Sequence, residues 1–153
     1  MEIRVRPGEV ADREQLSLMR LALWPQLFVD EDRQELDAAL SGKPASTMPL
    51  SILVAETDAG HLIGFLEVGL RSHADGCDAR VPVGFLEGWF VSESHRKKGV
   101  GAKLLAAAED WARACGCIEM ASDTWLDNDK SQRVHEALGF EVVDRCVHYR
   151  KAL

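Results

Sequence analysis

The sequence predicts a single α/β domain, built on one mixed sheet with helices on both of its faces. Segments with strand and helix character follow each other in the order βααβββαβαββ, and the strongest helical pattern comes directly after an apolar strand and a glycine turn. No linker or internal repeat divides the chain. A length of 153 residues is enough to bury a substantial core, so we expect residues 1–153 to form one domain.

The N-terminal part of the chain predicts a strand followed by two helices. Residues 2–6 alternate polar and apolar side chains, as strands do. Apolar residues then recur at helical spacing from Ala11 until Pro25, where proline ends the helix. A second, strongly acidic helix is expected over 30–40, followed by a loop over 41–49.

The central part predicts three strands. Residues 50–56 and 62–70 are rich in apolar side chains, and a Thr-Asp-Ala-Gly turn over 57–60 joins them. This pattern predicts a β-hairpin. A polar loop over 71–80 leads to a third long strand over 81–91.

The C-terminal part contains the clearest helix of the sequence. It starts after Gly99, and its apolar residues keep helical spacing as far as Gly116, which ends it. The remaining elements are expected to be a strand over 117–124, a short helix over 129–138, and a final strand pair over 140–144 and 146–151.

Composition excludes several classes of protein. The 25 acidic residues outnumber the 18 basic ones, which argues against nucleic acid as a partner, because its binding proteins need a basic face. The four cysteines show no Cys-x-x-Cys pair and no repeated ligand spacing, so we expect no metal site and no disulfide framework. We find no apolar run that could span a bilayer and no secretory signal, and we therefore expect a cytoplasmic protein with no membrane partner.

The stretch over 84–102 is the strongest candidate for a ligand site. Its apolar strand breaks into a polar turn, which continues into the long helix as Arg-Lys-Lys-Gly-Val-Gly over 96–101. Glycines let a ligand approach the backbone closely, and the first amides of a helix have no partners inside it, so this turn can bind phosphate oxygens. The motif is not a P-loop, because Gly101 is followed by Ala-Lys-Leu rather than by Lys-Ser/Thr. An ordinary turn is the alternative interpretation of the glycines alone.

These motifs resemble those of the GNAT superfamily of acyl-CoA-dependent N-acetyltransferases. The superfamily's Arg/Gln-x-x-Gly-x-Gly/Ala pattern is matched by residues 96–101, and its Asn with Gly-Phe eleven residues later is matched by Asn128 and Gly139-Phe140. The resemblance implies the GNAT fold, a mixed and mostly antiparallel sheet that is splayed between its central strands and has helices on both faces. It also implies acetyl-CoA as cosubstrate.

Within the superfamily, the sequence is similar to the aminoglycoside 6'-N-acetyltransferases. The similarity lies in Phe-Leu-Glu-Gly over 85–88, in Glu-Met-Ala-Ser-Asp-Thr over 119–124 and in Leu-Trp-Pro over 23–25, and it spans nearly the whole chain. It implies acetyl transfer to the 6'-amine of an aminoglycoside antibiotic by direct attack in a ternary complex, antibiotic resistance as the result, and a homodimer.

The resemblance also implies where the cofactor binds. The pyrophosphate of acetyl-CoA would lie on the backbone amides of the glycine turn, and the pantetheine arm would pair with the strand before it. Asn128 would hydrogen-bond this arm from the opposite wall. The cofactor-binding residues expected on this basis are Trp89, Phe90, Val91, Lys97, Lys98, Gly99, Val100, Gly101, Ala102 and Asn128.

Amine acetylation requires a group that takes a proton from the ammonium form of the acceptor. Glu87 is one candidate base, because a carboxylate between two apolar runs is costly unless it is paired or near water. Asp123 is the other, at the end of the neighbouring strand, where the resemblance implies that it faces the acceptor amine as base or as an anchor for its ammonium group. The alternatives are an edge-strand charge for Glu87 and a cap or turn position for Asp123. The order of the two stays open. The donor that reprotonates the thiolate also stays open between His135, Tyr149 and water, with a structural hydrogen bond as the alternative for His135 and a packed strand position as the alternative for Tyr149.

A polycationic acceptor calls for carboxylates and an aromatic wall. Trp24 is the aromatic candidate, and a core tryptophan is the alternative. His73 and Asp144 fall where relatives of this branch contact the acceptor, so we expect Trp24, His73, Glu87, Asp123 and Asp144 to bind it. The acidic residues at 30–32, 75 and 78 are interpreted as a long-range field rather than as contacts.

Two other functions compete with this interpretation. One keeps the chemistry and changes the acceptor to a polyamine, a small metabolite amine or a protein amine. The other is a non-catalytic acyl-CoA-binding domain, against which the two carboxylates argue.

Overall fold

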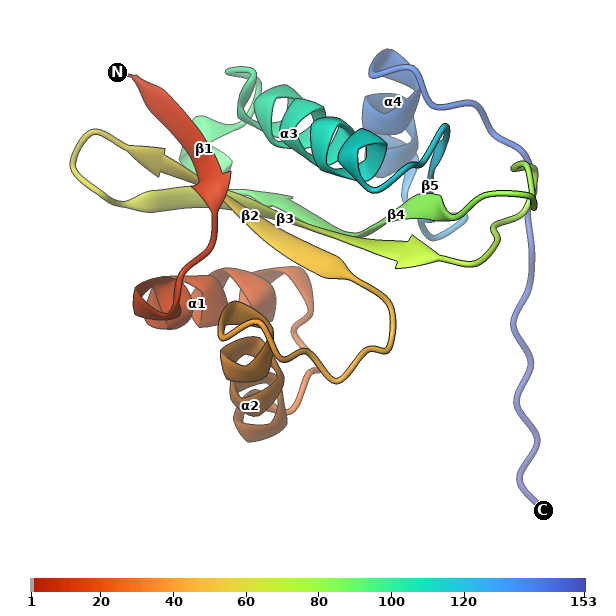
Figure 1. Ribbon diagram of the computed structural model, residues 1–153, viewed down its shortest axis with the longest axis horizontal. Helices are drawn as coiled ribbons and strands as arrows, with labels where there is room; N and C mark the ends of the chain where they lie inside the picture. The colour runs from red at the N-terminus through yellow and green to blue at the C-terminus, as the bar shows by residue number, and fades with distance from the viewer. Residues whose placement is uncertain (1) are drawn as a thin grey trace.

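The computed structural model describes residues 2–153, and these residues form a twisted five-stranded sheet with helices on both faces (Figure 1). The strands lie in the order β1-β2-β3-β4-β5. Helices α1 and α2 cover one face and α3 and α4 lie over the other (Figure 1). The bounds are β1 Ile3–Pro7, α1 Arg13–Leu23, α2 Val29–Leu40, β2 Leu50–Thr57, β3 Leu62–Arg71, β4 Val83–Val91, α3 Val100–Ala114, β5 Met120–Ser122 and α4 Asp129–Ala137, with short 3-10 turns η1 Val10–Asp12 and η2 Glu93–His95.

Four of the five strands pair antiparallel, and β5 pairs with β4 in parallel. The β4–β5 pairing covers only Gly84–Leu86 of β4 against Met120–Ser122. The C-terminal half of β4 therefore continues past the end of β5, and its β5-facing edge is left open. This is the splay that the resemblance implies.

Each face of the sheet buries its own apolar core. Leu66, Val68 and Leu86 pack under Leu104 and Leu105 of α3. On the opposite face, Phe65 and Val54 pack under Leu16 of α1 and Leu36 of α2. Side chains alternate between the two faces of a strand, so the core residues of β3 and β4 show which face their neighbours in the strand occupy.

Most of the elements expected from the sequence are confirmed. The first strand, the helix that ends before Pro25, the acidic helix, the hairpin over 50–70 and the helix after Gly99 all form close to the expected bounds. The mixed sheet with helices on both faces is confirmed as well.

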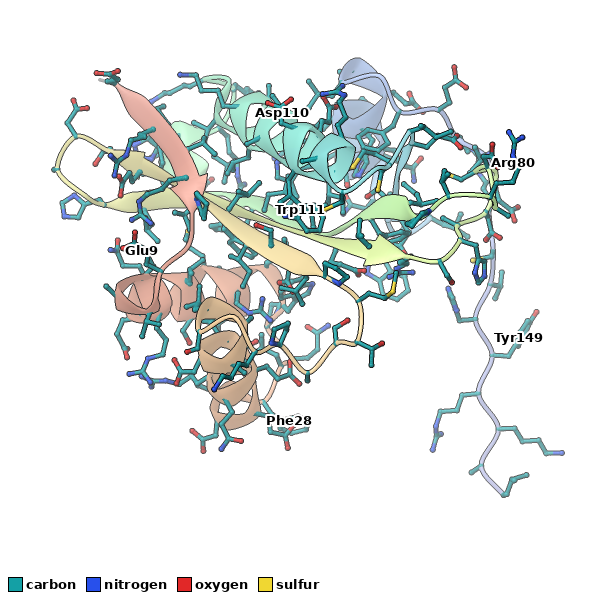
Figure 2. All side chains as sticks on the ribbon, viewed as in Figure 1. Glu9, Phe28, Arg80, Asp110, Trp111 and Tyr149 are labelled. Atoms are coloured by element: carbon teal, nitrogen blue, oxygen red, sulfur yellow. The ribbon has the colours of Figure 1, made fainter. Side chains whose placement is uncertain are left out.

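Two expectations about the C-terminal part are wrong. The strand expected over 117–124 is only three residues long, and residues 140–153, for which the sequence predicts a strand pair, contain neither helix nor strand. This C-terminal segment extends away from the body (Figure 1), and its Tyr149 side chain is 92% exposed rather than packed (Figure 2). A strand needs a hydrogen-bonding edge, and β5 offers too short an edge to hold two more strands. As a consequence, the splay lies beside the edge strand of the sheet and not at its centre.

Two further observations concern composition. The four cysteines are free thiols, and no group of three or more metal-ligating side chains that could hold an ion occurs in residues 2–153. No helix in this part of the chain is long and apolar enough to cross a membrane.

Candidate acceptor and cofactor site

A β-bulge in β4 forms the centre of the candidate site. Glu67 of β3 pairs with Gly88, whereas the next residue, Val68, pairs with Leu86, so Glu87 is an extra residue without a partner in the ladder. Leu86 faces the α3 core, and Gly88 faces α1. A bulge of this kind bends the strand and re-aims its side chains.

Trp24 lies directly over Gly88. A Cβ atom on Gly88 would come 2.6 Å from Cη2 of Trp24, so only glycine leaves room for the indole. The ring also meets Phe65 edge-on, with centroids 6.2 Å apart, and the Arg20 guanidinium lies 5.0 Å from it. Trp24 is half-buried and packs against the core of this face, and its role as an aromatic wall for the acceptor stays a prediction.

The carboxylate of Glu87 is held by Arg71. Nε of Arg71 donates to Oε1 at 3.0 Å and Nη2 donates to Oε2 at 2.9 Å, so both oxygens are engaged. The guanidinium is stacked on Phe85, with Cζ 3.4 Å from the ring centroid. Both side chains remain partly exposed, at 45% for Arg71 and 37% for Glu87.

Asp123 is brought to the same level of the sheet. Leu86 and Ser122 are partners in the parallel pairing, so Glu87 and Asp123 are each the next residue along adjacent strands. Ser122 hydrogen-bonds His135 on the α4 side, and Asp123 is the first residue after β5. Asp123 is exposed.

A buried ionic cluster lies next to this region. Arg20 of α1 donates to Asp32 of α2 at 2.9 Å and also bonds Glu67 of β3. Burial raises the pKa of Glu67, Arg20 opposes this effect, and the charges of Glu87 and Asp32 add to it. The interpretation of Asp32 as part of a diffuse field is wrong. Asp32 is a buried partner of Arg20, and its Oδ2 has no hydrogen-bond partner.

The glycine turn has the geometry expected of an anion site. Lys97 and Gly99 have positive φ values of 60° and 80°, which fold the chain back before α3 begins. The first intrahelical bond runs from the Lys103 amide to the Gly99 carbonyl at 3.1 Å. The amides of Val100, Gly101 and Ala102 therefore point out of the helix end, where the helix dipole also attracts anions.

The side chains at this turn serve the protein itself. Arg96 donates through Nε to the Val91 carbonyl at 2.9 Å, and Lys98 donates to the Ser94 carbonyl at 2.8 Å. The turn thus offers backbone amides while its cations brace the loop. Trp89 packs beneath the turn, because a Cβ on Gly101 would lie 3.3 Å from its indole, and the buried Trp89 Nε1 has no hydrogen-bond partner.

Asn128 is the N-cap of α4, and its side chain accepts a hydrogen bond from the Ser131 amide at 3.1 Å. His135 follows on the same helix. Its Nδ1 lies 2.7 Å from the Ser131 carbonyl, which can only accept, so Nδ1 carries the proton. In the neutral ring Nε2 then accepts from the Ser122 hydroxyl at 2.8 Å. The structural alternative for His135 is the one that these contacts favour.

No contact within one chain brings His73 or Asp144 together with the other expected site residues. His73 is exposed on the loop after β3 and bonds its neighbour Ser72 at 3.1 Å. Asp144 lies on the exposed C-terminal segment and accepts from the Arg145 amide at 2.7 Å.

Three residues of this region did not emerge from the sequence. Arg71, Arg20 and Glu67 meet their partners across separations of 16 and 47 residues, and no local pattern encodes such contacts. The only available signal for Arg71 was the predicted hairpin, which places the end of one strand beside the middle of the next.

Comparison with known proteins places the chain in a family. Residues 14–140 match the acetyltransferase (GNAT) family. An aminoglycoside N(6')-acetyltransferase type 1 from Klebsiella aerogenes is 43% identical over 97% of this chain and 96% of its own length. One of the same name from Stenotrophomonas maltophilia is 36% identical over 97% and 93%.

Solved structures agree with these relatives. AAC(6')-Iy in complex with the bisubstrate analogue CoA-S-monomethyl-acetylneamine has a TM-score of 0.86 and 37% identity, and both chains are covered completely, at 100%. The aminoglycoside 6'-N-acetyltransferase AAC(6')-Ih from Acinetobacter baumannii has a TM-score of 0.87 and 31% identity, with 99% of each chain covered. With its splayed sheet, its glycine turn and these relatives, the chain belongs to the acetyltransferase (GNAT) family, among members named aminoglycoside 6'-N-acetyltransferases.

Proposed function

We propose that this protein is an acetyl-CoA-dependent 6'-N-acetyltransferase of aminoglycoside antibiotics, whose activity confers resistance. The observation that carries the proposal is the bulge in β4, where the carboxylate of Glu87 lies beside the start of the open edge of that strand. The names of the relatives supply the acceptor class, and the neighbour bound to a CoA bisubstrate analogue supports the cosubstrate.

Acetyl-CoA would be held by the turn and by the open edge of β4. The outward amides of Val100–Ala102 and the folded backbone at 97–99 suit its pyrophosphate, and the open space around Gly99 leaves room for it. The backbone of Trp89–Val91 suits the pantetheine arm, with Asn128 on the opposite wall. When bound, this cosubstrate supplies an activated acetyl group.

The protein's own groups would move the proton and stabilise charge. Glu87 or Asp123 takes the proton from the acceptor ammonium, which frees the nitrogen lone pair for attack. A backbone amide in Trp89–Val91 donates to the oxygen that becomes negative. Of the three candidate donors to the thiolate we favour water, because both ring nitrogens of His135 are already engaged by Ser122 and Ser131 and Tyr149 is exposed on the C-terminal segment.

The acceptor would approach from the α1–α2 side of the sheet. Trp24 gives it an aromatic wall, and the surrounding carboxylates attract its ammonium groups. His73 and Asp144 complete the residues that we propose for its binding. We also propose that the protein acts in the cytoplasm.

We further propose a homodimer. The C-terminal segment supports it, because Val142, Val143, Val147 and Tyr149 leave apolar surface exposed on an extended chain, and β5 is an open edge. A second copy that takes up this segment would cover both and would bring its Asp144 to the acceptor side.

A panel of amines tests the acceptor class. Thiol release from acetyl-CoA is measured with aminoglycosides that have or lack a 6'-amine, with polyamines and with an amine-bearing peptide. We expect turnover with the 6'-amine compounds. Turnover of other amines alone would overturn the proposed substrate, and saturable acetyl-CoA binding without any turnover would favour a non-catalytic acyl-CoA-binding domain.

A further inference from the structure

We propose that Arg71 is a tethered placeholder for the ammonium group of the acceptor, and that an amine must displace it from Glu87 to react. The inference rests on the proposed function, because it concerns the carboxylate that we assign to the acceptor amine. It goes beyond that function because it names a residue that determines which amines bind and how strongly they bind.

Arg71 already makes the contacts that an acceptor ammonium would make. Its two bonds, at 3.0 and 2.9 Å, use both oxygens of Glu87. The fork takes the side of the carboxylate from which one ligand can bond both oxygens at once, so an amine that approaches on this side and the guanidinium compete for one position.

The fold places Arg71 beside the carboxylate of Glu87. Arg71 is the last residue of β3, and the residue two before it, Gly69, pairs with Phe85. The guanidinium lies over the ring of Phe85, 3.4 Å from its centroid. The stack supports the cation laterally while its end reaches Glu87, and a rotation about the side chain is enough to remove it.

The charges of the region require that another cation take the place of Arg71 when it leaves. Asp32, Glu67 and Glu87 face the guanidinium groups of Arg20 and Arg71, which leaves one carboxylate in excess. An ammonium that replaces Arg71 restores the same balance. If Arg71 merely left, the repulsion between Glu67 and Glu87 would be unrelieved, because each charge acts on the other.

The Arg71–Glu87 pair is of a strength that allows exchange. The side chains are 45% and 37% exposed, and ion pairs in such surroundings change an equilibrium constant by about fivefold at most. A tethered group nevertheless acts at an effective concentration of roughly millimolar. A dilute monoamine therefore competes poorly, whereas a polycation with further carboxylate contacts competes well, which gives the site a preference for polycationic acceptors.

The test compares Arg71→Gln with the wild-type full-length protein, and Arg80→Gln is the matched control. The Arg80→Gln substitution removes the same charge from the loop that follows β3. In the wild type, Arg80 makes a similar two-point contact, with Asp78. For an aminoglycoside with a 6'-amine, we expect Arg71→Gln to lower KM about three- to fivefold and to keep kcat within about twofold. Arg80→Gln should leave both constants unchanged. For 6-amino-6-deoxyglucose, which carries the reacting amine alone, the gain in kcat/KM should be at least as large.

Two further measurements distinguish displacement of Arg71 from a structural role of this residue. Calorimetric titration of the aminoglycoside gives the change in Kd without turnover, so it remains decisive if the assigned activity fails. Millimolar guanidinium chloride should inhibit Arg71→Gln competitively and more strongly than wild type, because it refills the vacated position. An unchanged or weaker Kd in Arg71→Gln, or a tenfold loss of kcat at wild-type thermal stability, would overturn the placeholder and make Arg71 a positioning residue for Glu87. Absence of aminoglycoside turnover in wild type would instead contradict the proposed function.

Discussion

At the scale of single residues, the position of Glu87 follows from one unpaired position in a ladder. In a regular strand, the residue after Leu86 would pair with β3 and lie among core side chains. The bulge leaves Glu87 outside the ladder, partly exposed and in reach of Arg71. A charged carboxylate can therefore sit between apolar runs without the cost of full burial.

Charge-neutral replacement tests both candidate bases. We expect Glu87→Gln or Asp123→Asn to lower kcat/KM about a thousandfold, equivalent to about 4 kcal/mol of transition-state stabilisation, because an amide cannot take the ammonium proton. The measurement is thiol release under saturating acetyl-CoA, with circular dichroism to confirm folding. Asp110→Asn is the control, since Asp110 is 80% exposed on the outer side of α3 (Figure 2). Activity within about threefold of wild type in both variants would refute the acid–base assignment.

Gly88 gives a second test at this scale. A methyl group on Gly88 would meet the Trp24 ring at 2.6 Å, so we expect Gly88→Ala to lower the free energy of unfolding by about 1–3 kcal/mol and to raise KM for the acceptor more than for acetyl-CoA. Urea unfolding and steady-state kinetics measure the two effects. Gly69→Ala is the stability control in the neighbouring strand, because its Cβ would have contacts no closer than 3.7 Å. Equal effects of the two substitutions would show that Trp24 does not constrain the bulge.

At the scale of elements, one arginine joins three of them. Arg20 of α1 bonds Asp32 of α2 and Glu67 of β3, and its guanidinium also lies against Trp24. The α1–α2 pair is therefore fixed to the strand that faces the bulge. The acceptor side of the site depends on this anchor for its shape.

Removal of Arg20 should be costly for this reason. We expect Arg20→Met to lower the free energy of unfolding by about 3–5 kcal/mol, because two buried carboxylates lose their cation. Arg13→Met removes a more exposed arginine of the same helix and should change it by less than about 1 kcal/mol. Urea denaturation followed by fluorescence measures both, and similar losses in the two variants would contradict the anchoring role.

At the scale of the whole molecule, the C-terminal segment is the part of the chain that does not pack against the sheet. The body is covered on both faces of its sheet, whereas residues 141–153 are exposed along their whole length. A second copy is the partner that we propose for this segment.

Truncation after Phe140 tests the role of the segment. We expect the full chain to have a mass of about twice 16.9 kDa in solution and the truncated chain to be a monomer with a higher KM for the acceptor, because Asp144 is lost. Light scattering after size exclusion measures the mass. A full-length monomer would contradict the homodimer, and a truncated dimer would place the interface elsewhere.

The sequence by itself determined the features that depend on neighbouring residues. Helical spacing after Gly99 and up to Pro25 and the turn over 57–60 each act over a few residues, and the structure confirms each of them. The glycine turn belongs to this class, because its positive φ values are local. The cofactor and acceptor residues around it rest on the resemblance to the family and stay predictions.

Only the tertiary structure decided which distant groups meet. The pairing of Arg71 with Glu87 depends on the register of a hairpin and on a one-residue bulge, and the burial of Asp32 depends on how α2 packs against α1. The unpaired C-terminal segment is a further case in which local sequence pattern did not decide the structure. Its sequence has strand character, but a strand forms only where it pairs with a hydrogen-bonding edge, and in one chain this segment extends away from the sheet.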